Sequence, residues 1–78
     1  MPRLRLFGPI ADAAGTRVDL VEGSSVEEVV DAATVRYGAS FADQARLCRV
    51  WVNGEAPPPG LVLDHDDEVA LLPPVSGG

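Results

Sequence analysis

Residues 25–38 read SVEEVVDAATVRYG and contain the strongest structural signal in the chain. Ser25 and Glu28 have the spacing of a capping box, in which the serine oxygen accepts a backbone N–H and the glutamate reaches back. Gly38 is well placed to end the helix. Because valine-rich helices have modest intrinsic propensity, we expect packing on a sheet to stabilise this one. Its predicted apolar face comprises Val26, Val29, Val30, Ala33 and Tyr37.

Two alternating runs precede this helix and predict strands, at residues 3–7 and 16–21. A short connection joins them, and residues 10–14 within it can form a single helical turn. Such a short connection favours an antiparallel pair. The side chains expected to point inward are Leu4, Leu6, Val18 and Leu20.

The second half of the chain predicts a short helix at residues 40–46 and a strand at 48–52. Asn53-Gly54 is the strongest hairpin signal in the sequence. The three prolines at 57–59 exclude regular strand pairing there, and residues 68–72 form a last strand. The strand at 48–52 is expected to point Val50 and Val52 inward and Trp51 outward.

This order of elements predicts an α+β roll of the β-grasp, or ubiquitin-like, type. We expect a mixed sheet of four or five strands packed on one main helix, in a single domain at residues 1–72. A chain of 78 residues hides only about 60% of its unfolded surface on folding. Little core is left for an enclosed active-site cleft, so a binding module, carrier or subunit is favoured over a self-sufficient enzyme.

Composition narrows the expected partners and location. Twelve acidic residues against six arginines give a formal net charge of −6. This charge argues against nucleic acid or an anionic membrane as partner and favours a basic protein. The single cysteine cannot form an internal disulfide, and we find no membrane-spanning run or signal peptide. We therefore expect a cytoplasmic protein.

Residues 73–78 read PPVSGG and follow the last strand directly. Two prolines cannot donate to a sheet ladder, so the strand must end at Leu72. Six extended residues can project roughly 20 Å, which predicts a flexible tail. Gly77 and Gly78 lack side chains and can enter a narrow channel. This layout suits presentation of a terminal carboxylate to an enzyme that adenylates it with ATP, after which a sulfur nucleophile can replace the adenylate.

The segment at residues 67–78, DEVALLPPVSGG, resembles the C-terminus of the MoaD-type sulfur carriers of the MoaD/ThiS family, the small subunits of molybdopterin synthase. Leu6-Phe7-Gly8, Thr16 and the VWVNG run at residues 50–54 fit the same family in order and spacing. The resemblance covers nearly the whole chain. One departure is that Leu71 and Leu72 occupy positions that are often phenylalanine in the family.

The resemblance implies that an E1-like activating enzyme adenylates Gly78 and that a sulfur donor protein converts it to a thiocarboxylate. The carrier then docks on the large subunit of molybdopterin synthase, within a heterotetramer, and inserts its tail. Its sulfur goes to a pterin precursor and builds the molybdopterin dithiolene of the molybdenum cofactor. Catalytic side chains are expected on the large subunit, and no permanently bound cofactor or metal is expected here. The tail that presents Gly78 comprises Pro73, Pro74, Val75, Ser76 and Gly77.

The expected partner interface is an exposed apolar cluster, a feature that usually marks an interaction surface. Alternatively, one or two of its members belong to the core. Arg3 and Arg5 share a face with Phe7 and either meet acidic partner groups or are simply solvated. The expected interface residues are Phe7, Trp51, Leu71 and Leu72.

Other hypotheses remain open at this point. The chain can be a sulfur carrier for thiamine or cysteine biosynthesis, a ubiquitin-like modifier joined through Gly78 to target lysines, or an interaction module with an inert tail. Two further sites are rejected. Cys48 has no histidine near it in sequence and suits a small buried position, and the aspartates around His65 suit a turn better than a metal.

Overall fold

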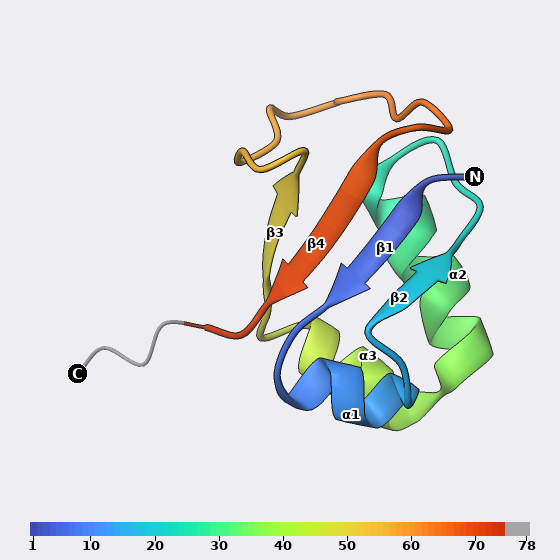
Figure 1. The fold of residues 1–78 in the computed structure, drawn as a ribbon, viewed down its shortest axis with the longest axis vertical. Helices are drawn as coiled ribbons and strands as arrows, with labels where there is room; N and C mark the ends of the chain where they lie inside the picture. The colour runs from blue at the N-terminus through green and yellow to red at the C-terminus, as the bar shows by residue number, and fades with distance from the viewer. Residues whose placement is uncertain (75–78) are drawn as a thin grey trace.

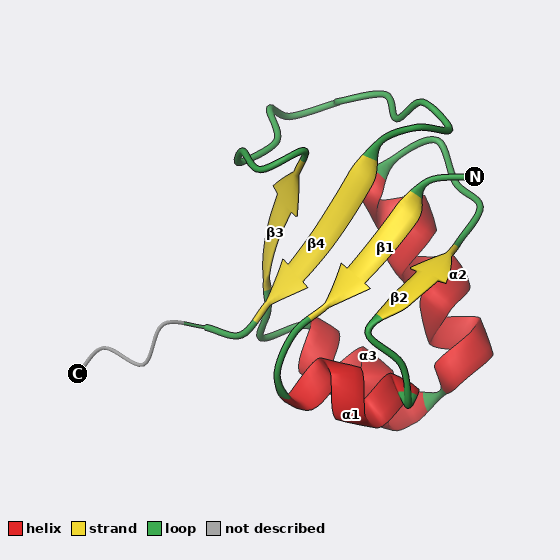
Figure 2. Cartoon of the chain, viewed as in Figure 1, coloured by secondary structure: helices red, strands yellow, loops and turns green. Residues whose placement is uncertain are grey.

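The computed structural model of this chain describes residues 1–74, which fold into one sheet and three helices (Figures 1 and 2). The helices lie behind the sheet in these views and leave its front face open. None of the three helices in this part of the chain has the length and apolarity needed to cross a bilayer. The elements in order are β1 (Arg3–Leu6), α1 (Pro9–Ala14), β2 (Val18–Leu20), α2 (Val26–Tyr37), α3 (Ala39–Ala45), β3 (Arg49–Val52) and β4 (Glu68–Leu72).

The strand order β2-β1-β4-β3 confirms the predicted β-grasp fold. At the centre β1 and β4 run parallel, while β2 and β3 pair antiparallel at the two edges. The fifth strand allowed by the sequence is reduced, within residues 1–74, to an isolated bridge between Val52 and Glu55. Asn53 and Gly54 form the predicted turn with positive φ at both positions, 53° and 83°.

Helix α2 begins and ends where its sequence predicts. The Ser25 hydroxyl oxygen accepts the backbone N–H of Glu28 at 3.1 Å, and Gly38 follows the last turn. The Glu28 carboxylate reaches back one residue further than a standard capping box and accepts the N–H of Ser24 at 2.8 Å. The helix buries Val29 and Ala33 against the sheet, so packing stabilises it as expected.

The core lies between the sheet and the helices. It includes one large side chain, that of Phe41, which the sequence pattern did not predict to be buried. Leu4 and Leu6 point inward as predicted. Phe41 of α3 is fully buried, and its ring lies 5.3 Å from that of Tyr37. The buried core comprises Leu4, Leu6, Ile10, Ala11, Val21, Val29, Ala33, Phe41, Val52, Leu63, Val69 and Leu71.

The prediction that Val18 and Leu20 point inward is wrong, because they are 48% and 53% exposed. Register explains the difference: Val18 lies opposite Arg5 in β1, and side chains opposite each other share a face. The inward position of β2 is taken instead by Asp19. Val21, just beyond the strand, enters the core.

Asp19 joins β2 to α2 through two side chains. The Tyr37 hydroxyl and the Arg36 guanidinium both donate to its carboxylate, and Arg36 also donates to the Leu20 carbonyl at 3.1 Å. The pKa of Asp19 lies below its ordinary value of 3.8, chiefly because of the Tyr37 hydrogen bond, and Arg36 adds to this against an opposing effect of burial. These hydrogen bonds satisfy the Asp19 carboxylate on the helix side of the sheet.

We expect Asp19→Asn to lower the free energy of unfolding by about 1 kcal/mol at pH 7. Because folding lowers the pKa of Asp19, the ionised carboxylate stabilises the fold above pH 3.8 and loses that effect as pH falls through the folded pKa. Urea unfolding at several pH values should therefore show the two proteins converging below pH 3.8. The control is Asp43→Asn, since the exposed Asp43–Arg46 pair should contribute less than about 0.5 kcal/mol. A constant difference at all pH values would contradict this account.

Candidate functional site

The open face of the sheet is the surface formed by the outward side chains of its four strands. Its middle row follows from the register: Val18, Arg5, Ala70 and Trp51 lie side by side across β2, β1, β4 and β3. Leu20, Arg3 and Glu68 form a second row, and Leu72 and Arg49 pair at the end where β4 leaves the sheet. Phe7, just beyond β1, lies at the same end, where its backbone N–H donates to the Leu71 carbonyl at 3.2 Å.

Three of the four predicted interface residues belong to this open face. Phe7 and Trp51 are 37% and 40% exposed, and Leu72 is half-buried on the same side as Ala70. Leu71 is 1% exposed and lies in the core, so the prediction that it faces a partner is wrong. The reason is strand alternation, which turns Leu71 toward the helices and its neighbours in β4 toward the open face.

Arg5, in the middle row of the open face, contacts an aromatic ring and a carboxylate. Its guanidinium carbon lies 5.5 Å from the centre of the Phe7 ring, within range of a cation–π contact. The same guanidinium approaches a Glu68 carboxylate oxygen at 3.5 Å. Arg5 thus presents charge and aromatic surface together at the edge of a hollow.

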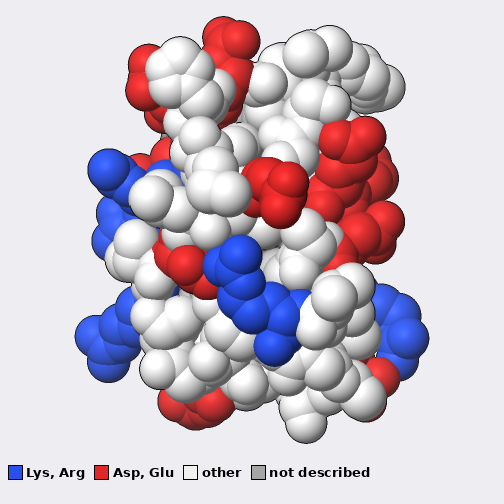
Figure 3. Space-filling model, turned by 90° about the vertical axis from the view of Figure 1, so that its right-hand side faces the viewer, with Lys and Arg blue, Asp and Glu red and all other residues white. Residues whose placement is uncertain are grey.

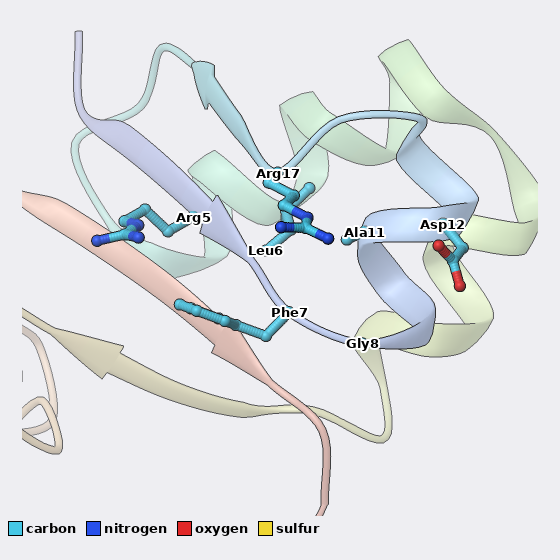
Figure 4. A pocket seen from close by; sticks show the side chains of 7 residues that line it. All are labelled: Arg5, Leu6, Phe7, Gly8, Ala11, Asp12 and Arg17. Atoms are coloured by element: carbon cyan, nitrogen blue, oxygen red, sulfur yellow. The ribbon is translucent and has the colours of Figure 1, made fainter.

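That hollow of about 300 Å³ lies between the end of β1, helix α1 and the start of β2 (Figure 4). Arg5, Phe7 and Arg17 line it from the strand side, and Asp12 lines it from α1. In Figure 4 the Arg17 side chain points toward α1, whereas those of Arg5 and Phe7 extend the other way, toward β4. The sequence pattern placed Arg5 and Phe7 on one face but gave no sign of Arg17, because Arg17 precedes β2 and only the turn through α1 brings it close.

The tail begins beside this hollow. A Cβ atom on Gly8, which lines the hollow, would lie 3.4 Å from Cγ of Pro73. Strand β4 ends at Leu72, as the two prolines predict, and Pro73 and Pro74 are exposed. The remaining predicted tail residues, Val75, Ser76, Gly77 and Gly78, lie outside the described residues.

Cys48 and Asp67, which lie away from the hollow, have pKa values that are shifted by their surroundings. Burial raises the pKa of the half-buried Cys48 thiol, which disfavours the thiolate that a nucleophile needs. The pKa of Asp67 is lowered because its carboxylate accepts the backbone N–H of Asp64 and the side-chain amide of Asn53. Asp67 thereby ties the Asn53-Gly54 turn to the start of β4. His65 is highly exposed and contacts only Asp66 among the charged groups of residues 1–74.

Comparison with known proteins decides the family, because the ThiS family model matches residues 4–78. This chain belongs to the ThiS family. Small archaeal modifier protein 1 from Haloferax volcanii is 34% identical to this ThiS-family chain over 84 aligned residues, which cover 95% of the chain and 97% of the relative.

Solved structures of relatives share the fold of this ThiS-family chain. The crystal structure of small archaeal modifier protein 1 from Haloferax volcanii aligns with a TM-score of 0.71 and 32% identity, covering 97% of each chain. The solution structure of the Methanosarcina acetivorans protein of the same name gives 0.78 and 27%, covering 97% of this chain and 94% of the other. The expected MoaD/ThiS family, with its ubiquitin-like fold, is thus confirmed, while these named relatives are modifier proteins.

Proposed function

We propose that this protein is a carrier whose C-terminal carboxylate, on Gly78, is activated by adenylation and then transferred. The observation that carries the proposal is that the central strand of a ThiS-family β-grasp domain leads directly into the sequence PPVSGG. A carboxylate is a poor electrophile because hydroxide leaves poorly. Activation therefore comes first, and the ThiS family implies an E1-like enzyme as the partner that performs it.

The chemistry needs little from this chain beyond its end. A carboxylate oxygen of Gly78 attacks the α-phosphorus of ATP, pyrophosphate leaves, and an acyl-adenylate forms. A nucleophile then attacks the acyl carbon and AMP leaves. Two side-chain-free residues at the end allow the partner's channel to be narrow, which supports this role for Gly77 and Gly78. Pro73 and Pro74 stiffen the start of the tail and direct it away from β4.

A protein amine is the acceptor that the comparisons favour. With a lysine side chain as nucleophile, Gly78 becomes joined through an isopeptide bond and the protein acts as a ubiquitin-like modifier. The name and fold of small archaeal modifier protein 1 support this fate. The chain has no lysine, so chains of modifiers linked through its own side chains are excluded.

A sulfur nucleophile is the second acceptor, and the DEVALLPPVSGG segment favours it. AMP is then replaced by sulfur and Gly78 ends in a thiocarboxylate. Docking on the large subunit of molybdopterin synthase would deliver this sulfur to the pterin precursor. Thiamine or cysteine biosynthesis would use the same thiocarboxylate with other partners.

The test follows the two fates of Gly78 in two parallel reactions. The protein is incubated with the E1-like enzyme of its own organism, ATP and a sulfur source, treated with a thiol alkylator and digested with trypsin. Cleavage after Arg49 releases residues 50–78, which lack Cys48, so an alkylated peptide carries sulfur at its end. In parallel, host extract and ATP should yield higher-mass conjugates that survive reducing and denaturing gels if lysines are acceptors. An unmodified peptide and no conjugates, beside an active control carrier, would overturn the proposal.

A further inference from the structure

The sheet has two edge strands, and the protein itself closes the outer edge of β2. Alternate residues of this strand, Asp19 among them, face β1, so the backbone groups of Val18 and Leu20 point outward. The Thr16 hydroxyl donates to the Val18 carbonyl at 3.0 Å and accepts the Val18 N–H at 3.4 Å. The Leu20 N–H donates to the Asp19 carboxylate at 2.8 Å, and the Leu20 carbonyl accepts from Arg36 at 3.1 Å. Because all four outward groups have partners, this edge is closed to a further strand.

The outer edge of β3, at the left of the sheet in Figure 1, is open at one residue. Asn53 and every second residue before it face β4, so the backbone groups of Val50 and Val52 point outward. The turn uses those of Val52, whose N–H donates to the Glu55 carbonyl at 2.7 Å and whose carbonyl accepts the Glu55 N–H at 3.1 Å. The N–H and carbonyl of Val50 have no hydrogen-bond partner within residues 1–74. Val50 is therefore the position at which another strand can pair with β3.

A groove of about 310 Å³ lies beside this open position. It is lined by Val50 itself, by Val26 and Glu27 of α2, and by the loop at residues 57–61. Three residues of that loop are prolines, which have no N–H, so they cannot donate to the Val50 carbonyl. The groove thus combines a largely apolar lining with an unpaired stretch of strand backbone, and peptide-binding sheet edges use both features.

The charge around this groove is negative. Glu27 lines the groove and forms no ion pair in the described part of the chain, whereas the neighbouring Glu28 is engaged by the N–H of Ser24. In Figure 3, where the open face turns to the left edge, a large acidic group lies toward the helical side. Together with the net charge of −6, these acids favour a basic occupant.

We propose that the outer edge of β3 binds an extended segment of a partner protein, in which an apolar residue has lysine or arginine two positions away. The apolar residue lies opposite Val50 and exchanges both backbone hydrogen bonds with it, in antiparallel pairing. Side chains opposite each other share a face, so this side chain enters the groove on the helix side, where Val50 packs against the core. The residue two positions away returns to the same face and places its charge near Glu27. This binding is noncovalent and does not depend on transfer of Gly78.

Charge favours such a segment over two other occupants. A second copy paired edge to edge through its own Val50 would bring two acidic grooves together, on molecules that each have a net charge of −6. A nucleic acid would be repelled by the same charge.

Hydrogen exchange followed by NMR tests whether the edge is open. In the free full-length protein, the Val50 amide should exchange at least about a hundredfold faster than the Trp51 amide, which faces β4 opposite Ala70. The neighbouring amide of the same strand is thus the internal control. Equally slow exchange at Val50 would show that the tail or a second copy already occupies the edge, and would overturn the inference.

The binding test uses a synthetic peptide of sequence KTVTK, acetylated at its N-terminus and amidated at its C-terminus. We expect a Kd on the order of 0.5 mM, read from the shift of the Val50 amide signal. N-methylation of the central valine removes the donor to Val50 and should raise Kd at least about tenfold. N-methylation of the following threonine is the matched control, because that N–H points away from β3, and it should change Kd by less than about twofold. Equal effects of the two methylations, or no shift at about 5 mM KTVTK, would overturn the inference and leave the proposed function intact.

Charge is tested with the same assay. Glu27→Gln should raise Kd for KTVTK about threefold. Asp31→Asn is the matched control, since it removes an exposed acid from α2 that does not line the groove, and it should have less than half of that effect. A peptide of sequence ETVTE should bind at least about tenfold more weakly than KTVTK. Equal affinity for the two peptides would overturn the choice of a basic segment. Circular dichroism verifies that each variant folds.

Discussion

Removal of Gly78 is expected to reduce adenylation of the carrier at least about a hundredfold. The shortened chain ends at Gly77, so its carboxylate lies about 3.5 Å short of the α-phosphorus when the domain is docked. Misplacement of a reacting atom by even about 1 Å can cost about a hundredfold in rate. The measurement is ATP–pyrophosphate exchange with the E1-like enzyme, followed by mass analysis of the C-terminal peptide.

The control for this deletion is Val35→Ala. Val35 is 89% exposed on α2, on the side of the sheet away from the open face, and its truncation should leave exchange within about twofold of the wild-type rate. Adenylation of the deleted protein at the wild-type rate would contradict the assignment of Gly78 as the reacting residue.

Phe41→Ala is expected to cost about 3–5 kcal/mol of unfolding free energy, the largest effect on stability of any single truncation that we consider. Phe41 is fully buried in α3 and its ring packs against Tyr37. Domains of this length have roughly 4–12 kcal/mol in total, so the substitution should remove between about a quarter and all of the stability. Urea unfolding followed by circular dichroism measures the loss.

Leu47→Ala provides the comparison in the segment that follows α3. Leu47 is 59% exposed, so its truncation should change the unfolding free energy by less than about 0.5 kcal/mol. Similar losses for the two variants would show that α3 does not anchor the core as described.

The sequence predicted the order of the elements because strong local signals mark them. The capped helix at residues 25–38, the Asn53-Gly54 turn and the Pro73-Pro74 stop each act through neighbouring residues, and the structure has all three. Local signals say less about which face of a strand turns inward. Residues 18–21 place apolar side chains at both even and odd positions, and pairing with β1 selects one phase. Alternation along β4 likewise turns Leu71 inward, although Leu72 beside it is also apolar.

The features that could not be predicted from the sequence depend on contacts between segments that are distant along the chain. Helix α3 spans seven residues, too few for helical periodicity to single out Phe41 as a core residue. Asp19 looks like an ordinary exposed strand residue until Arg36 and Tyr37, seventeen and eighteen positions later, are placed beside it. That Arg5 and Arg17 line one hollow likewise depends on the path of the intervening turn.

The parallel pairing of β1 with β4 also determines how the protein responds to mechanical force. The chain enters β1 at one end of this pair and leaves β4 toward the tail at the other end (Figure 1). Tension between the N-terminal residues and the tail therefore acts along both strands and loads their hydrogen bonds in shear, all at once rather than one after another. Resistance to such pulling depends on the rate of unfolding and not on equilibrium stability. An unfolding motor that pulls on the tail would thus meet the central pairing of the sheet first.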